Sequence, residues 1–379
     1  MMMWHSKCRV SSPFHPSVYT SRGLQKVFPL APNYIVYLKI WFDILTPKQV
    51  MFFRRAVDLL RNSGHEVLCT SRKYREAAEL ARIKKLDLTV VGSHGGADRY
   101  NKLRESASRT YELAEVVKRS GPDVAVTFSS PEGSRVAFGL GIRHIGFNDS
   151  PHAEAVAKLT IPLTSKLYCP WVIPRSAWSG YGIAKKNIVH YRALDPAAWL
   201  KHDETPEVKQ DKKMILLRLE ESKASYIADK KIGTAKMIDS FVNKLSQLAN
   251  IVVLCRYEDQ IAEVESSYGD KVHVLQDVVD GTTLVKSTHL FVGAGGTMTA
   301  EAALLGKPTI SIAPIQFYTQ RYLVKSGLVK RAITSKSLVR LCMKMISDES
   351  YMQAQKKKAA RILGSMEDPT DSVISALRL

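Results

Sequence analysis

Short apolar runs alternate with amphipathic stretches along most of the chain. Residues 37–44 form an apolar run typical of a buried strand. After Pro47, apolar residues recur at helical spacing until Gly64. The same rhythm repeats many times, and strictly alternating strands and helices predict a parallel sheet with helices on both faces.

The rhythm divides the chain into two halves. In the first half we expect strands at 37–44, 65–70, 89–91, 122–128, 143–147, 168–174 and 188–192, with helices at 47–63, 74–84, 104–118 and 132–140. In the second half we expect strands at 214–219, 251–255, 272–275, 290–292 and 309–312, and one short strand after residue 325. Helices are expected there at 234–248, 260–267, 282–286, 297–305, 320–325, 336–346 and 351–363. The predicted domains are 37–195 and 214–350, with a polar linker at 196–213 and a C-terminal helix and tail at 351–379.

A glycine-rich segment in the second half, residues 290–312, has the pattern strand, turn, helix, strand. Thr297 or Thr299 is expected to cap the helix, Gly306 to end it and Pro308 to prevent its continuation. The turn itself is formed by Gly293, Gly295 and Gly296.

This glycine turn predicts a phosphate site, because a helix N-terminus offers unpaired N–H groups and the positive end of the helix dipole. The spacing is neither the dinucleotide fingerprint nor a P-loop. The alternative is an ordinary strand–helix junction that needs glycines for packing. Arg218, at the end of a predicted strand, is either a bidentate clamp for diphosphate oxygens or a surface arginine.

Polar residues follow several strands of the first half, where ligands of parallel sheets bind. His94 lies in a second glycine loop and is either a general base or an exposed loop histidine. Asp149 is either the base, a partner that orients His152, or a helix cap before Pro151. Lys48 and Gln49 begin a helix at the same edge, and we expect them to contact sugar or acceptor.

The run Gly-Gly-Thr, then Glu301, then Leu-Gly-Lys-Pro resembles the nucleotide-binding segment of the GT-B superfamily. That superfamily contains nucleotide-sugar glycosyltransferases and UDP-N-acetylglucosamine 2-epimerases. The resemblance implies an α/β, GT-B-like fold, with two Rossmann-like, doubly wound domains facing a central cleft. It also implies that the turn (Gly293, Gly295, Gly296, Thr297) receives the diphosphate of a UDP-linked sugar and that Glu301 bonds the ribose. The alternative for Glu301 is a carboxylate that only interacts with the helix dipole. A bound metal is not expected, and no other cofactor is expected beside this co-substrate.

Several phrases more closely resemble an uncharacterised, mainly archaeal GT-B-like family that carries a domain-of-unknown-function label. They lie at residues 40–49, 64–67, 147–153, 167–170 and 293–308. The epimerases carry a His-Gly-Asp after a strand of their first domain. The corresponding place here is Phe128-Ser129-Ser130, which has no carboxylate. Asp149 alone leaves the pair of acids that epimerisation needs incomplete.

Composition narrows the partners without choosing among them. The 379 residues carry a net charge of +19, which suits a sugar nucleotide, nucleic acid or anionic membrane. The five cysteines are unclustered, which favours a reducing cytoplasm. The basic charge adds peripheral contact with a membrane as a further option. No apolar stretch is long enough to span a membrane.

Residues 1–36 are expected to be a disordered leader, since residues 1–33 contain no acidic residue and no periodicity.

The leading functional hypothesis is a nucleotide-sugar-dependent glycosyltransferase with an anionic or lipid-linked acceptor. Gln316 and Gln320 are weaker candidates for sugar contacts. One alternative is a sugar-nucleotide epimerase or hydrolase of the 2-epimerase type. The other is a non-catalytic binder of anionic polymer or nucleic acid, although no nucleic-acid-binding motif is present.

Overall fold

The computed structural model of the chain describes residues 37–96, 98–207, 212–219, 235–255 and 258–378. The predicted leader at 1–36 lies outside these residues.

The first half is built on a seven-stranded sheet in the order β3-β2-β1-β4-β5-β6-β7, and every pairing is parallel. The chain adds strands toward one edge of the sheet from β1 to β3 and toward the other edge from β4 onward. Ligands of doubly wound sheets bind at such a reversal, which lies here between β1 and β4. The strands are β1 (Lys39–Asp43), β2 (Glu66–Lys73), β3 (Thr89–Ser93), β4 (Val124–Thr127), β5 (Arg143–Phe147), β6 (Lys166–Pro170) and β7 (Ile188–Tyr191).

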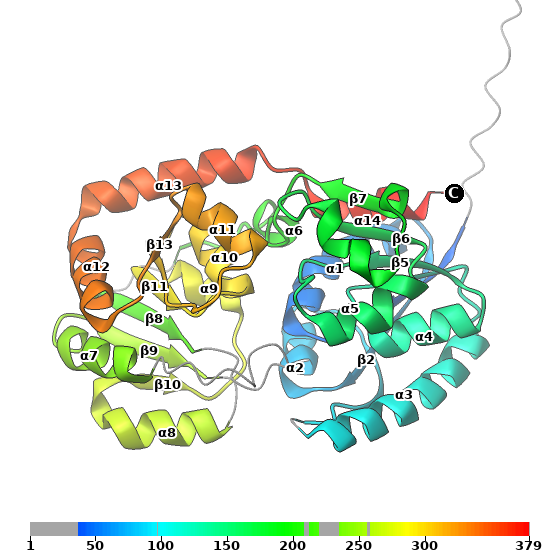
Figure 1. The fold of residues 1–379 in the computed structure, drawn as a ribbon, viewed down its shortest axis with the longest axis horizontal. Coiled ribbons are helices and arrows are strands. Elements are labelled where there is room, and N and C mark those ends of the chain that lie inside the picture. Colours follow the sequence, from blue (N-terminus) through cyan, green and yellow to red (C-terminus); the bar gives the residue numbers. More distant parts are fainter. Residues whose placement is uncertain (1–36, 97, 208–211, 220–234, 256–257, 379) are drawn as a thin grey trace, which may run out of the picture. The chain divides into compact units, whose positions relative to one another are not determined.

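Helices cover both faces of this sheet (Figure 1). They are α1 (Pro47–Asn62), α2 (Arg75–Ile83), α3 (Arg99–Ser120), α4 (Pro131–Gly139), α5 (Glu154–Thr160) and α6 (Ala197–Leu200). Short 3₁₀ turns lie at Ile161–Leu163, Arg175–Tyr181 and Lys185–Asn187. The predicted start of α3 at residue 104 was too late, because the Asp98 side chain accepts a hydrogen bond from Asn101 N and caps the helix earlier.

The second half is built on a six-stranded parallel sheet in the order β10-β9-β8-β11-β12-β13. The strands are β8 (Met214–Arg218), β9 (Asn250–Leu254), β10 (His273–Leu275), β11 (Leu290–Gly293), β12 (Thr309–Ser311) and β13 (Val329–Arg331). Here the order reverses between β8 and β11. Two doubly wound parallel-sheet domains therefore confirm the predicted fold class.

The helices of the second half are α7 (Ala235–Leu245), α8 (Glu258–Tyr268), α9 (Gly281–Lys286), α10 (Thr297–Leu304), α11 (Tyr318–Lys325), α12 (Ser335–Ser347) and α13 (Glu349–Gly364), with a 3₁₀ turn at Gly269–Lys271. The C-terminal segment then forms another helix, α14 (Pro369–Leu377), rather than the predicted tail. This helix returns to the first sheet and packs on α1 (Figure 1).

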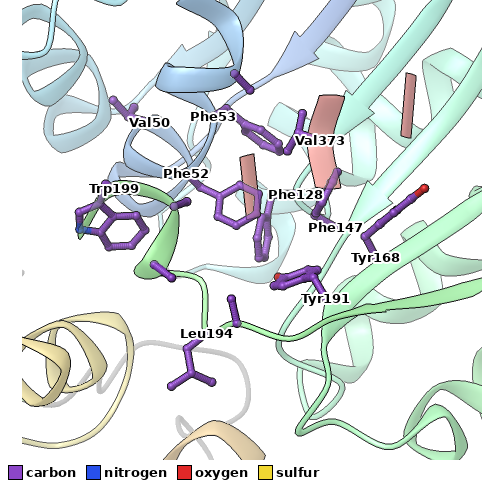
Figure 2. Packing of buried hydrophobic residues seen from close by; sticks show 14 of the residues in the cluster. Val50, Phe52, Phe53, Phe128, Phe147, Tyr168, Tyr191, Leu194, Trp199 and Val373 are labelled. Carbon is purple, nitrogen blue, oxygen red and sulfur yellow. The ribbon is translucent and has the colours of Figure 1, made fainter. Parts of the chain in front are cut away.

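Aromatic rings fill the core beneath α1. The Phe52 ring packs edge-on against Phe53, Phe128 and Phe147, with centroids 5.1, 5.2 and 5.4 Å away. Figure 2 shows these rings together with Val373, which α14 contributes to the same cluster. Offset and edge-to-face aromatic pairs add stabilisation beyond the area they bury. The core therefore holds β1, β4 and β5 in fixed positions and positions the loops at their carboxyl ends.

The segment predicted as a polar linker begins with a buried helix. All four residues of α6 are at most 8% exposed, and the helix packs on α1 and α14. Sheet strands lie at 39–191 and at 214–331, within the predicted domain limits of 37–195 and 214–350. Within the part of the chain that the structure describes, no helix combines the length and hydropathy needed to cross a bilayer.

Candidate functional site

The glycine turn lies at the carboxyl end of β11, where the strand order of the second sheet reverses. Gly295 and Gly296 both have positive φ, +99° and +77°, which residues with a Cβ rarely adopt. Gly296 is itself the N-cap of α10, so the prediction that Thr297 or Thr299 caps the helix was wrong. The Thr299 hydroxyl instead donates to the Gly295 carbonyl at 2.9 Å.

The glycines of this turn are needed for different reasons. A Cβ on Gly293 would lie 2.5 Å from Cε1 of Phe291, so this glycine is required for packing. A Cβ on Gly296 would meet nothing within 4 Å, so the space beside it is open. Open space at the first turn of a helix is what the approach of an anionic group to backbone N–H groups requires.

Gln320 lies beside this turn. Its Oε1 is 3.5 Å from the position that a Cβ on Gly295 would take, and its Nε2 donates to the Ser311 hydroxyl. The side chain is buried. The backbone carbonyl of Gln316 accepts a hydrogen bond from Arg321 Nε at 3.0 Å. A sugar contact for either glutamine stays a prediction.

Arg218 ends β8 and is the register partner of Gly293 on β11. Its Nη1 donates to the carbonyls of Leu254 and Cys255 at 3.0 and 2.9 Å. These bonds hold the guanidinium at the carboxyl ends of β8 and β9, next to the glycine turn. The structure thus brings Arg218 and the turn together, and its role toward a diphosphate stays a prediction.

Glu301, one helical turn into α10, is only 5% exposed. It accepts hydrogen bonds from the Thr282 hydroxyl and from the indole N–H of Trp199, the latter at 2.9 Å. Burial raises the pKa of Glu301, and these two donors only partly offset that effect. The predicted bond to a ribose is untested, but the carboxylate already has two protein partners, which the sequence did not indicate.

In the first half, Lys48 joins two carboxylates at the carboxyl edge of the sheet. Its Nζ lies 2.7 Å from Asp149 Oδ2 and 2.6 Å from Asp195 Oδ2, and 4.2 Å from the centroid of the Phe128 ring. Tyr191 donates its hydroxyl to Asp195 Oδ1 at 2.6 Å. We name Lys48, Asp149, Asp195 and Tyr191 the lysine cluster.

Burial and charge act differently on the two carboxylates of the lysine cluster. Burial alone would raise the pKa of Asp149, but the Lys48 ammonium outweighs it, so the pKa lies below its ordinary value of 3.8. For the more deeply buried Asp195, burial wins and raises the pKa to about 6. Asp149 therefore remains ionised in neutral solution, as a base must, and Asp195 changes charge in mildly acidic solution.

The other predicted residues of the first half lie at the same edge but do not form one cluster. Gln49 is buried, with its Oε1 accepting from Leu45 N at 2.6 Å and its Nε2 donating to the Phe128 carbonyl at 2.9 Å. These bonds fix the turn between β1 and α1. A substrate contact for Gln49 is untested, although the backbone already engages both ends of its amide.

The two predicted histidines have different surroundings. His94 is exposed, stacks on Tyr74 with centroids 5.4 Å apart, and accepts a bond from Gly96 N at Nδ1. His152 stacks on Phe317 of the second half at 3.3 Å, and burial lowers its pKa to about 4. His152 is consequently neutral at physiological pH and a weak proton acceptor. Catalytic roles for both remain predictions.

The sequence missed a second buried charge cluster. Asp43, the last residue of β1, accepts from Arg109 at 2.6 and 3.1 Å and from the Ser130 hydroxyl at 2.5 Å. Glu132 lies 3.5 Å from the same arginine and accepts from Ser106. The segment Phe128-Ser129-Ser130, which corresponds to the His-Gly-Asp of the epimerases, therefore has a carboxylate beside it. Asp43, at the end of another strand, accepts the hydrogen bond from Ser130. Its position at a strand end was the available signal.

Comparisons with known proteins agree with this architecture. A model of the family described as "Protein of unknown function (DUF354)" matches residues 38–377. An uncharacterized protein of Methanocaldococcus jannaschii, MJ0665, is 27% identical over 353 residues, which cover 89% of this chain and 97% of that protein.

Solved structures of two enzyme classes share the fold. The UDP-GlcNAc 2-epimerase of Neisseria meningitidis, bound to UDP-GlcNAc, has a TM-score of 0.67 at 14% identity and covers 90% of this chain and 99% of its own. The S. aureus MnaA–UDP structure has a TM-score of 0.69 at 14% identity, with coverage of 89% and 95%. The spinosyn forosaminyltransferase SpnP has a TM-score of 0.61 at 14% identity, with coverage of 90% and 98%.

Proposed function

Because the chain belongs to the DUF354 family and has the GT-B-type fold of nucleotide-sugar enzymes, we propose that it is a nucleotide-sugar-dependent glycosyltransferase. The observation that carries this proposal is the turn at Gly295 and Gly296. Two consecutive positive φ angles and the open space beside Gly296 leave room for a diphosphate at the N-terminus of α10. UDP is the nucleotide we expect, since relatives of the same fold bind UDP or UDP-GlcNAc.

The chemical step would use this chain's own groups. Backbone N–H groups at the start of α10 would stabilise the negative charge that develops on the departing diphosphate. Asp149 would take the proton from the acceptor hydroxyl, since it is ionised at neutral pH and lies at the edge where the first sheet would hold an acceptor. Lys48 would hold Asp149 in place through their 2.7 Å ion pair.

A second candidate is epimerisation at the carbon next to the anomeric centre. Two observations favour it: the TM-scores of 0.67 and 0.69 with the 2-epimerase and MnaA structures, and the presence of Asp43 near Ser130. Against it, Asp43 is fully buried and already bonded to Arg109 and Ser130, so it is poorly placed to exchange protons with a sugar.

One experiment separates the two candidates. The full chain is incubated with UDP-GlcNAc in D₂O and followed by proton NMR, with and without a set of phosphorylated and lipid-linked acceptors. A transferase releases UDP only with an acceptor and leaves the C2 hydrogen in place. We expect Asp149→Asn to lower the rate of acceptor-dependent UDP release by on the order of a hundredfold, the usual contribution of a general base. Exchange of the C2 hydrogen for deuterium without acceptor would replace our proposal with the epimerase.

A further inference from the structure

Arg72 on β2 has a buried hydrogen-bond donor that the described residues of the first half do not use. Among the described residues, its Nε is buried and has no hydrogen-bond partner. Burial lowers the pKa of this guanidinium, and the nearby carboxylates of Glu132 and Asp43 offset that only in part. A buried donor without a partner costs stability unless a ligand satisfies it.

The neighbouring carboxylates are already occupied by other donors. Asp43 accepts from both Nη atoms of Arg109, from Thr70 Oγ1 at 2.6 Å and from Ser130 Oγ. Glu132 Oε1 accepts from Ser106 at 2.6 Å. Arg109, from α3, balances the charge of one of these two carboxylates. The attraction of both carboxylates to the Arg72 guanidinium balances the other, while the Nε donor of Arg72 stays without a partner among the described residues.

The local backbone places Arg72 at an irregularity of the sheet edge. Ser71 pairs with Val90 and Lys73 with Ser93, so Arg72 faces two residues of β3, Val91 and Gly92. Such bulges redirect side chains and are common next to binding sites. Gly92 has φ +69°, and a side chain there would collide with Arg109.

The loop that follows β3 adds donors and space at the same edge. Tyr74, directly after β2, stacks on His94. Gly96 N donates to Nδ1 of His94 at 3.1 Å, so a neutral imidazole carries its proton on Nε2 as a donor. Gly96 has φ +68°, and nothing lies within 4 Å of where its Cβ would be.

We propose that Arg72, together with His94 and the loop at Gly95-Gly96, binds an oxyanion group, phosphate or carboxylate, of the second substrate. The guanidinium matches such a group with two parallel hydrogen bonds, which a lysine could not supply. The site lies in the first half, whereas the diphosphate of the donor would occupy the turn in the second half. That the oxyanion belongs to a sugar acceptor rests on the proposed function; the oxyanion site itself does not.

The test uses the full chain and two probes, inorganic phosphate and acetate, each compared with chloride at equal ionic strength. Thermal unfolding is measured for the wild type, Arg72→Gln and Lys73→Gln, in the presence and absence of UDP. Lys73 is the adjacent exposed residue and loses the same charge, so it is the matched control. A ligand that binds only the folded state raises the melting temperature, which gives an apparent affinity for each probe.

We expect Arg72→Gln to lower the apparent affinity for at least one probe tenfold or more, with less than a twofold change in Lys73→Gln. Which probe responds distinguishes a phosphate from a carboxylate. In chloride alone, Arg72→Gln removes a buried donor without a partner but also loses the attraction of the guanidinium to Glu132 and Asp43, so the probe responses decide the outcome. A lower melting temperature in chloride, with equal probe responses in all three proteins, would show that Arg72 only supports the fold and would overturn the inference.

The UDP arm keeps this result separate from the proposed function. Stabilisation by UDP that is equal in wild type and Arg72→Gln supports two independent sites. If UDP fails to bind while the Arg72-dependent response persists, the oxyanion site stands and the proposed function does not. If UDP binds but phosphate and acetate act equally on wild type and Arg72→Gln, only the oxyanion site is refuted.

Discussion

At the scale of single residues, the surroundings of Lys48 decide what each carboxylate can do. Asp149 and Asp195 contact the same ammonium at nearly equal distances, yet the pKa of Asp149 is lowered and that of Asp195 is raised to about 6. Two effects raise the pKa of Asp195: its deeper burial, which penalises the charged form, and repulsion by the ionised Asp149. Asp149 also accepts a hydrogen bond from the Ser150 hydroxyl, which lowers its own pKa. One ammonium thus keeps one carboxylate ionised and leaves the other able to hold a proton.

This arrangement predicts a pH dependence of stability for Asp195→Asn. The folded-state pKa of Asp195 is above its ordinary value of 3.8, so its contribution to stability is fully present below about pH 4 and is lost as pH rises through about 6. Asn resembles the protonated form. The free energy of unfolding of Asp195→Asn, relative to wild type, should therefore rise between pH 4 and 7 by on the order of 2–3 kcal/mol. Urea denaturation at a series of pH values measures it.

Asp149→Asn is the control of opposite sign. The folded-state pKa of Asp149 is depressed, so its contribution is present above its ordinary pKa and is lost as pH falls. Relative to wild type, this variant should lose stability at neutral pH and recover in acid. If both variants follow the same pH trend, the assignment of opposite shifts is wrong.

Two residues of the lysine cluster could be predicted from the sequence. Lys48 and Asp149 follow predicted strands and were found by the rule that ligands bind at carboxyl ends of strands. Asp195, Asp43 and Arg72 were not selected, because their importance depends on which distant side chains they face. Asp195 gains its role only when β7 packs beside β6 and brings it to Lys48.

At the scale of elements, most strands and helices could be predicted, because apolar periodicity follows directly from which face is buried. The start of α3 and the whole of α14 were missed. Both had local signals: Asp98 and Asp368 accept bonds from backbone N–H groups of the following turn, and Pro369 is at the first helical position of α14. The buried α6 was misread as linker, since four residues are too few to show periodicity.

Helix α14 should contribute measurably to the stability of the first half, although it is the last element of the chain. Val373 is fully buried in the cluster around Phe53. We expect Val373→Ala to lower the free energy of unfolding by about 2 kcal/mol, the lost transfer of two methyl groups plus the cavity left behind. Denaturation in urea measures the change. The exposed Ser375→Ala on the same helix is the control, and equal effects of the two variants would contradict the packing.

At the scale of the whole molecule, each half places its candidate groups at the carboxyl edge of its sheet near the reversal of strand order. The reversals lie between β1 and β4 and between β8 and β11. Trp199, between the two sheets in sequence, donates to Glu301 on the helix that begins at the glycine turn. This bond ties α10 to α6, and no local sequence pattern predicts it, since the two residues are distant in the chain.

Phosphate binding at the glycine turn is tested most directly by calorimetry, with UDP titrated into the wild type, Gly296→Val and Gly141→Val. Gly141 also has positive φ, +69°, and open space around its Cβ position, but lies in the first half, away from the turn. Valine at Gly296 would fill the space that the diphosphate needs and strain the turn.

We predict saturable binding of UDP to the wild type and to Gly141→Val. For Gly296→Val we predict a dissociation constant at least tenfold higher, a loss of about 1.4 kcal/mol or more of binding free energy, with the fold retained. Absence of UDP binding by the wild type, or equal affinity for UDP in Gly296→Val, would contradict a diphosphate site at the glycine turn. In the second case the turn after β11 would be only a packed strand–helix junction.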